Sequence, residues 1–306
     1  MTIGAADIDS STVIDAVLHY DASIYDHLII RLVRMPRVVS GMMVGASLAV
    51  AGGIMQGLTR NPLASPGILG VNAGAAFAVV LAVYLLGQVS LRAYMSYALL
   101  GAAVAGIIVY GLGSMGHGGM TPLKLTLAGA VFTAFVTSFT SALLISDQET
   151  LDQIRFWTAG SLAGRDWELV EFIAPILGGG MIGALVIARQ ITTISLGEDI
   201  ARGLGQNTVL IRLIAACLVV FLAGGSVALA GPIAFVGLIA PHLARFVVGA
   251  DYRWILPYSA ALGALIITIG DTLARIIVKP EELPVGVMTA LIGAPFFIYL
   301  ARWKVR

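Results

Sequence analysis

The chain has 306 residues, of which 58% are hydrophobic and only 11% are charged, and its mean hydropathy is +0.95. Soluble domains carry about 25% charged residues, so a soluble protein of this length could not bury so much apolar surface. A single cysteine, Cys217, excludes an intrachain disulfide, and the absence of a basic run argues against nucleic acid as a partner. The composition predicts an all-α polytopic protein whose solvent is membrane lipid.

Residues 1–30 form an acidic amino-terminal segment without Lys or Arg. No basic stretch followed by an apolar one marks a signal peptide. We expect an extracytoplasmic segment over 1–30, followed by a single transmembrane domain over 31–306. The segment carries five aspartates, which are Asp7, Asp9, Asp15, Asp21 and Asp26.

Nine apolar segments follow in the sequence, each near the roughly 20 residues that a helix needs to cross a bilayer. Glycine and alanine are frequent within them, and small residues let membrane helices approach closely. We therefore expect about nine packed transmembrane helices. They lie near residues 35–58, 66–87, 93–113, 123–146, 168–190, 208–230, 232–248, 255–278 and 284–302.

The charges between these segments favour one orientation. If the carboxyl terminus is cytoplasmic, the inner side holds 10 basic and 3 acidic residues, and the outer side holds 8 basic and 13 acidic residues. Cytoplasmic loops of membrane proteins carry an excess of Lys and Arg. We expect a cytoplasmic carboxyl terminus.

An internal repeat links the first and the sixth segments. Residues 45–54 and 224–233 share six identities in ten positions, and the same offset of 179 places Pro62 on Pro241. The two copies cross the membrane in opposite directions, as in the inverted repeats of transporters. Chance similarity between two helices rich in small residues is the alternative.

Two motifs interrupt apolar sequence. Asn61 and Pro62 belong to the motif Arg60–Pro66, which predicts a turn, and Pro232 and Pro241 predict a broken or sharply turned helix. Non-helical backbone is stable at membrane depth only where other protein groups or the water of a cavity form hydrogen bonds with its N–H and C=O groups. His242 follows the second break as a ligand, a proton relay or a hydrogen-bonded interfacial residue.

Residues 196–205 lie in the longest inner loop and predict a short amphipathic helix. Leu196, Ile200 and Leu204 share one face at helical spacing. Glu198, Asp199 and Arg202 are polar, and Gly205 provides a stop. The helix either lies on the membrane surface or contacts a cytoplasmic partner.

Charged residues also mark the outer side. Asp271 and Arg275 are four positions apart on one helix, so they form a pair with either a structural or a functional role. Arg34 and Arg37 stand at the outer mouth of the first span, where they contact lipid headgroups or an acidic partner.

The sequence holds no phosphate-binding loop, no paired metal-binding histidines and no nucleophile elbow. We therefore expect a protein that moves a solute and is not an enzyme. If ATP drives it, ATP and Mg²⁺ bind to a separate chain, and this chain itself binds no cofactor and no metal.

Several motifs together resemble the FecCD/BtuC-type permeases of ABC importers for siderophores, haem and cobalamin. They occur in family order over residues 20–306. The matching pieces are Arg34–Arg37, Arg60–Pro66, Trp157–Gly160, Leu196–Gly205, Gly231–His242, Asp271–Arg275 and Glu282–Pro295.

The resemblance implies a dimer of two permease chains, identical or paralogous, with two ATPase subunits on the cytoplasmic side and a solute-binding protein on the other. It implies that Arg34, Arg37 and Arg275 dock the binding protein, and that residues 196–205 form the coupling element for the ATPase. In that element the motif positions are Leu196, Gly197, Glu198, Asp199, Ala201, Arg202, Leu204 and Gly205.

The resemblance also places a cytoplasmic gate at Thr121, Pro122, Leu123 and Lys124, although Pro122 and Leu123 replace the small hydroxyl residues of the family. The family has ten helices, so its first helix is expected to be missing from this chain. The implied function is import of an iron(III)-siderophore complex across the bacterial inner (plasma) membrane by alternating access. Haem or cobalamin import, or an ion-coupled secondary transporter, are the alternatives.

Overall fold

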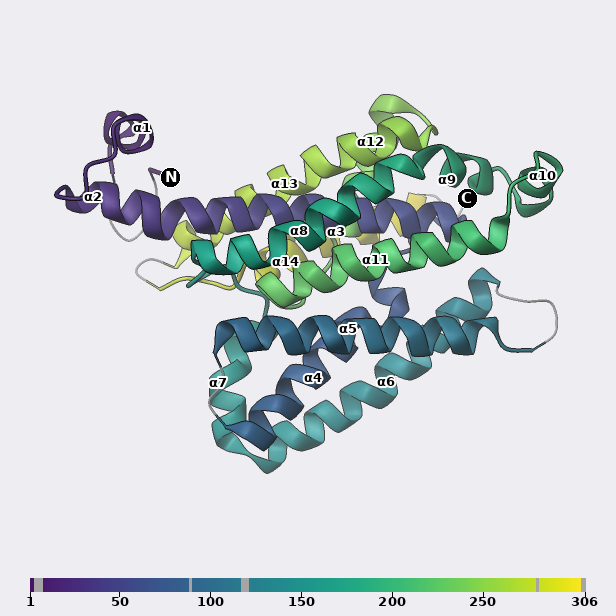
Figure 1. Cartoon of the computed structure of the whole chain (residues 1–306), viewed down its shortest axis with the longest axis horizontal. Helices are drawn as coiled ribbons and strands as arrows, with labels where there is room; N and C mark the ends of the chain where they lie inside the picture. The colour runs from purple at the N-terminus through teal and green to yellow at the C-terminus, as the bar shows by residue number, and fades with distance from the viewer. Residues whose placement is uncertain (3–7, 88–89, 117–120, 279–280, 304–306) are drawn as a thin grey trace.

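In the computed structural model the chain is a bundle of helices, and it has no strand among the residues described, which are 1–2, 8–87, 90–116, 121–278 and 281–303. The expected all-α class is confirmed (Figure 1). Four residues that entered the charge comparison lie outside the described part of the chain, namely Asp7, Lys279, Lys304 and Arg306.

Six helices of the described chain are long and apolar enough to cross a membrane. The first runs without interruption from Tyr25 to Thr59 through α2 (Tyr25–Leu28), a π-helical stretch η1 (Ile29–Arg34) and α3 (Met35–Thr59). The domain boundary expected at residue 30 therefore falls inside a continuous helix. The other five are α5 (Leu91–Ser114), α6 (Pro122–Ser146), α8 (Trp167–Val186), α11 (Thr208–Ala230) and α13 (Tyr252–Ile277).

Three apolar helices are shorter, namely α4 (Val71–Leu86), α12 (Val236–Val248) and α14 (Val285–Trp303). Each of the nine expected segments thus contains at least one helix, but not all of these helices are full spans. With 13 residues, α12 rises about 20 Å, which is less than the roughly 30 Å of a bilayer core. The expectation that 232–248 forms a spanning helix was wrong, because the chain from Gly231 to Phe235 is not helical.

Short helices cover the two ends of the bundle. The amino terminus, α1 (Ser10–Leu18) and α7 (Gln148–Thr158) lie at one end, which we call the α7 end (Figure 1). The carboxyl terminus, α9 (Ala188–Ser195) and α10 (Glu198–Gly203) lie at the opposite end, the α10 end. The expected helix 168–190 divides at Ile187 into α8 and α9.

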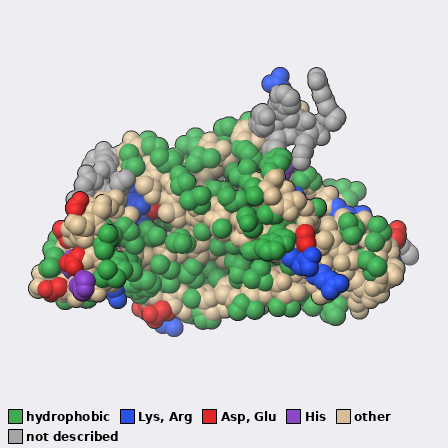
Figure 2. Space-filling view, turned by 90° about the horizontal axis from the view of Figure 1, so that it is seen from above, with side chains coloured by type: hydrophobic (Ala, Val, Ile, Leu, Met, Phe, Trp, Pro, Cys, Tyr) green, Lys and Arg blue, Asp and Glu red, His purple; other side chains and the backbone are tan. Residues whose placement is uncertain are grey.

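The surface and the core have the distribution expected in lipid. Hydrophobic side chains cover the middle of the molecule, and charged ones gather towards its ends (Figure 2). In the first long helix 72% of the most apolar stretch is buried, whereas in α6 only 17% is buried. The helix containing α3 is therefore a central element, and α6 is a peripheral one.

Glycines bring α3 into backbone contact with α13 and α12. A Cβ atom built on Gly45 would lie 2.2 Å from the carbonyl oxygen of Gly263 in α13. One built on Gly52 would lie 1.7 Å from the carbonyl oxygen of Gly237 in α12. Only glycine permits these approaches, as expected from the abundance of small residues.

The repeat has a structural counterpart. The helices α3 and α11 run in opposite directions, and each is followed by non-helical chain and then by a short helix (Figure 1). After α3 the non-helical chain leads into the 3₁₀-helix η2 (Pro66–Leu69) and α4. A Cβ atom built on Gly237 would lie 3.0 Å from Pro66 Cδ, so the two breaks meet inside the bundle.

The two prolines that the repeat aligns do not occupy equivalent positions. Pro62 lies in the turn after α3, as expected, whereas Pro241 lies inside α12, which continues to Val248. Of the two prolines in the second motif, only Pro232 lies in the break between α11 and α12. The expectation that Pro241 interrupts a helix was wrong.

Candidate functional site

The α10 end presents a short exposed helix where the sequence predicts one. Gly197 and Gly205 have positive φ values of 132° and 79°, which restrict α10 to the residues between them. The apolar side chains of Leu196, Ile200 and Leu204 are 62%, 52% and 70% exposed. A helix is present within the predicted range, but it is shorter than predicted, and Leu196 and Leu204 flank it. With Ile200 of α10 they form an exposed apolar group.

The polar side chain of Glu198 attaches α10 to the bundle. Its carboxylate accepts hydrogen bonds at 2.6 Å from Arg202, one turn along, and at 2.6 Å from Arg212 on α11. Burial acts to raise the pKa of Glu198, but the hydrogen bonds and charges of Arg212 and Arg202 outweigh it and lower that pKa. Ala201 is buried, while Asp199 is exposed. Because Glu198 holds α10 against α11 and the apolar side chains at and beside α10 are exposed, this segment is a candidate docking element.

The residues 121–124 begin α6 at the same end. Thr121 caps the helix, since its Oγ1 accepts a hydrogen bond from the backbone N–H of Lys124 at 3.3 Å, and Pro122 follows at the first helical position. The Nζ of Lys124 donates to the carbonyl oxygen of Met115 at 3.3 Å. Leu123 is 69% exposed.

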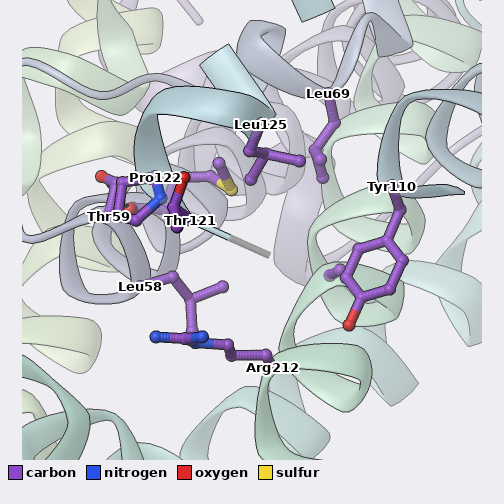
Figure 3. A pocket seen from close by; sticks show the side chains of 10 residues that line it. Leu58, Thr59, Leu69, Tyr110, Thr121, Pro122, Leu125 and Arg212 are labelled. Carbon is purple, nitrogen blue, oxygen red and sulfur yellow. Dashed lines mark hydrogen bonds between the residues drawn. The ribbon is translucent and has the colours of Figure 1, made fainter. Parts of the chain in front are cut away.

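A small cavity lies between this helix start and the rest of the bundle (Figure 3). Its volume of about 10 Å³ has room for about one water molecule. Thr121 and Pro122 line it together with Thr59, Tyr110 and Arg212. Arg212 thereby joins the expected gate to the expected coupling element, because it also binds Glu198.

Sequence reasoning missed the role of Arg212. An arginine five residues into the apolar segment 208–230 was available as a signal, because an ionisable residue within a span needs a specific reason. Its partner Glu198 lies 14 positions away in another helix, a spacing that no helical periodicity reveals.

The α7 end contains a network of buried ion pairs. The guanidinium of Arg37 binds Asp271 on α13 at 2.8 Å and Glu282 at 2.6 Å. Arg275 approaches Asp271 at 3.3 Å, which confirms the expected pair at positions i and i+4. Arg34 is 7% exposed and donates a hydrogen bond to the carbonyl oxygen of Met1.

The structure thus brings Arg34, Arg37 and Arg275 to one end, but their side chains are buried. The side chain of Arg37 is 12% exposed and that of Arg275 is 5% exposed. A carboxylate of a partner protein would have to compete with Asp271 and Glu282 for Arg37, and with Asp271 for Arg275. Glu282 entered the sequence reasoning only as part of a motif, because its distance of 245 positions from Arg37 conceals the contact.

The helix-break residues lie where the two non-helical segments enter the bundle. Asn61 accepts a hydrogen bond from the backbone N–H of Leu63 at 3.0 Å, which stabilises the turn after α3. Beside the second break, a Cβ atom built on Gly160 would lie 2.6 Å from the carbonyl oxygen of Pro232. His242 is 3% exposed and meets Phe246 edge to face at 5.0 Å between ring centroids.

Over most of its length the chain is similar to known transport proteins. The chain is 50% identical over 277 residues to the siderophore transport system permease protein YfiZ of Bacillus subtilis, covering 90% of this chain and 83% of YfiZ. It is 46% identical over 302 residues to the iron(3+)-hydroxamate import system permease protein FhuB of the same organism, covering 99% of this chain and 78% of FhuB.

A solved structure of a metal-chelate type ABC transporter, in an inward-facing conformation, matches with a TM-score of 0.83 at 32% identity and covers 95% of both chains. A multi-pass helical bundle with an inverted repeat is the architecture of a membrane transport protein. Residues 1–303 match the FecCD transport family, and the chain belongs to that family.

Proposed function

We propose that the chain is the permease subunit of an ABC importer that carries an iron(III)-siderophore complex across the bacterial inner membrane. It has its carboxyl terminus in the cytoplasm and works by alternating access. The single observation that carries the proposal is the segment around α10, where Leu196, Ile200 and Leu204 are exposed while Glu198 pairs with Arg212 on α11. A carrier driven by an ion gradient has no need of such a docking helix.

The energy enters through two ATPase subunits at the α10 end, which bind ATP and Mg²⁺. Each ATPase receives Leu196, Ile200 and Leu204 in a groove, so a movement of the ATPase displaces α10. Arg212 transmits that displacement to the start of α6, since it contacts both Glu198 and the cavity beside Thr121. Residues 121–124 then act as the cytoplasmic gate.

A second permease chain, identical or paralogous, completes the pathway along α6. Along that helix, Leu127, Val131 and Phe135 are 57%, 68% and 63% exposed at spacings of four residues. The low burial of α6 within one chain supports its position beside a second chain. The solute-binding protein docks at the α7 end, where Arg34, Arg37 and Arg275 gather.

The cargo follows from the relatives. YfiZ and FhuB are named for siderophore and iron(3+)-hydroxamate transport, and the ferric enterobactin permease FepD of Escherichia coli is 42% identical over 307 residues. A hemin permease of Yersinia pestis is 40% identical over 273 residues, which keeps hemin as the second candidate.

Uptake of a ⁵⁵Fe-labelled siderophore tests the energy source and the cargo. Proteoliposomes containing the complete importer are expected to accumulate the complex with ATP and not with a proton gradient alone. Accumulation driven by the gradient without ATP would replace the proposal with a secondary transporter. Uptake of hemin in preference to every iron-siderophore tested would correct the cargo and leave the energy source unaffected.

A further inference from the structure

A cavity of about 420 Å³ at the α10 end brings the two helix-break motifs together. Arg60 and Pro62 of the first motif line it from the turn after α3. His242 and Arg245 line it from α12, and Tyr252 lines it from the start of α13. The transport mechanism proposed above gives this cavity no role.

Neutral groups hold Arg245 in place. One terminal nitrogen of its guanidinium donates to Gln56 Oε1, and the other donates to the hydroxyl of Tyr252 at 2.7 Å. Gln56 is 2% exposed, and its amide nitrogen donates in turn to the carbonyl oxygen of Leu238 at 3.3 Å. The guanidinium is therefore positioned by hydrogen bonds, while none of these partners neutralises its charge.

Among the residues that the structure describes, no carboxylate lines the cavity. The nearby Asp251 pairs with Arg253 at 2.7 Å, and Glu198 is occupied by Arg202 and Arg212. Arg60 makes no ion pair with any part of the chain that the structure describes. Its backbone has a left-handed φ of 51°, which is uncommon for a residue with a side chain. Two arginines thus line one recess, and no carboxylate of the described residues lines it with them.

The surroundings of the cavity indicate where an anion would come from. Phe246 lines the cavity and is also 70% exposed, so its ring connects the recess with the outer surface. Val247 and Trp254, close in sequence to the lining residues Phe246 and Tyr252, are 71% and 58% exposed. Exposed aromatic and aliphatic side chains beside basic ones are typical of the level of the lipid headgroups.

We propose that this cavity binds the phosphate group of an anionic phospholipid. Arg60 and Arg245 contact the phosphate oxygens through charge-assisted hydrogen bonds, while Phe246 and Trp254 contact the acyl chains. The bound lipid joins the turn after α3 to α12 and α13. The site does not depend on the cargo or on the energy source of the transporter.

Native mass spectrometry of the complete importer, delipidated in detergent and titrated with lipid, tests the proposal. We expect dioleoylphosphatidylglycerol, and not dioleoylphosphatidylcholine, to be retained. Arg60→Gln with Arg245→Gln is expected to weaken this binding roughly thirtyfold, about fivefold for each arginine. Arg60→Lys with Arg245→Lys keeps the charges and is expected to retain most of it.

Arg189→Gln is the matched control, because Arg189 is an exposed arginine on α9 at the same end and does not line the cavity. If the double Gln variant fails to fold, Arg60→Gln alone replaces it, because this residue is exposed. Unchanged phosphatidylglycerol binding in the Gln variant overturns the proposal. The proposal is also overturned if the importer with its ATPase subunits bound retains no phosphatidylglycerol. It is likewise overturned if inorganic phosphate binds in a way that depends on Arg60 and phosphatidylglycerol does not displace it.

Discussion

Arg37 on α3 binds Asp271 on α13 through both carboxylate oxygens, with its Nε at 3.1 Å from each, across 234 positions of the chain. Because both side chains are almost entirely buried, the contact fixes the start of one central helix against the end of another. Arg275 and Glu282 extend it to four charged groups of balanced sign.

Asp271→Asn tests this network. The substitution leaves the buried guanidinium groups of Arg37 and Arg275 without their shared carboxylate, and removing one partner of a buried pair costs about 3–5 kcal/mol. We expect a lower thermal midpoint of unfolding in detergent. Asp152→Asn, which removes an exposed partner of Arg155, is the control and is expected to leave the midpoint unchanged. Equal midpoints for both variants would contradict the structural role of the network.

Glu282→Gln addresses the docking of the binding protein. Glu282 is the more exposed of the two carboxylates that bind Arg37, so its neutralisation frees one edge of the guanidinium for a partner carboxylate. We expect the binding protein to associate severalfold more tightly, as measured by surface plasmon resonance with the importer in nanodiscs. Glu168→Gln, at the same end in the pair with Arg92, serves as the control. Weaker association in Glu282→Gln would remove Arg37 from the docking surface.

Ile200→Asp with Leu204→Asp tests the coupling role of α10. Both side chains are more than half exposed, so the isolated permease is expected to fold normally. An apolar groove on the ATPase would have to bury two charges, and we expect the subunits to separate during size-exclusion chromatography. Ile14→Asp on α1, a residue 60% exposed at the opposite end, provides the comparison. A stable complex in the α10 variant would assign ATPase binding to another surface.

Gly52→Ala tests the contact between α3 and α12. The added methyl group would stand 1.7 Å from the carbonyl oxygen of Gly237, so the helices have to separate. Overpacking of this kind costs about 1–3 kcal/mol. Gly178→Ala in α8 meets nothing within 4 Å and is expected to be neutral or slightly stabilising. The two midpoints, measured by thermal unfolding in the same detergent, should therefore move in different directions or by clearly different amounts.

Asp251→Asn examines the acid dependence of stability. Hydrogen bonds from the side chain and the backbone N–H of Arg253 lower the pKa of Asp251 to about 2. In the unfolded chain the pKa of an Asp side chain is about 4. Because the pKa of Asp251 is lower in the folded protein, the ionised carboxylate stabilises the fold above pH about 4, and this stabilisation is lost as the pH falls towards 2. Because Asn also caps helices well, the variant should be less stable than the wild type at pH 7 and equal to it near pH 2. A constant difference across this range would contradict the ion pair.

Much of the fold could be predicted from the sequence, because hydropathy and helix length are local properties. All nine apolar segments contain a helix, and the short α10 lies within the range 196–205 that the spacing predicts and ends before Gly205, the predicted stop. The length of α12 was overestimated because residues 231–235 are as apolar as a helix would be. Their break depends on contacts with residues far along the chain, such as the backbone approach of Gly160 to Pro232.

The candidate site was predicted less completely, for the same physical reason. The pair of Asp271 and Arg275 follows from a helical spacing of four positions. The contacts of Arg37 with Glu282 and of Arg212 with Glu198 join different helices, and no periodicity reveals them. The arginines at the α7 end were expected at the surface, but an arginine near a helix end also satisfies its charge by turning inward towards a buried carboxylate.

The glycine contacts of α3 limit how this protein can change shape. Where two backbones touch without intervening side chains, as at Gly45 with Gly263 and at Gly52 with Gly237, no layer of side chains can re-adapt to a sliding motion. The helices α3, α12 and α13 therefore travel as one rigid block through any transport cycle. Gly129 of α6 makes the same kind of contact with η2, since a Cβ atom built on it would lie 1.8 Å from the carbonyl oxygen of Ile68. The displacement that opens and closes a passage must therefore be concentrated where layers of side chains, and not touching backbones, separate the helices.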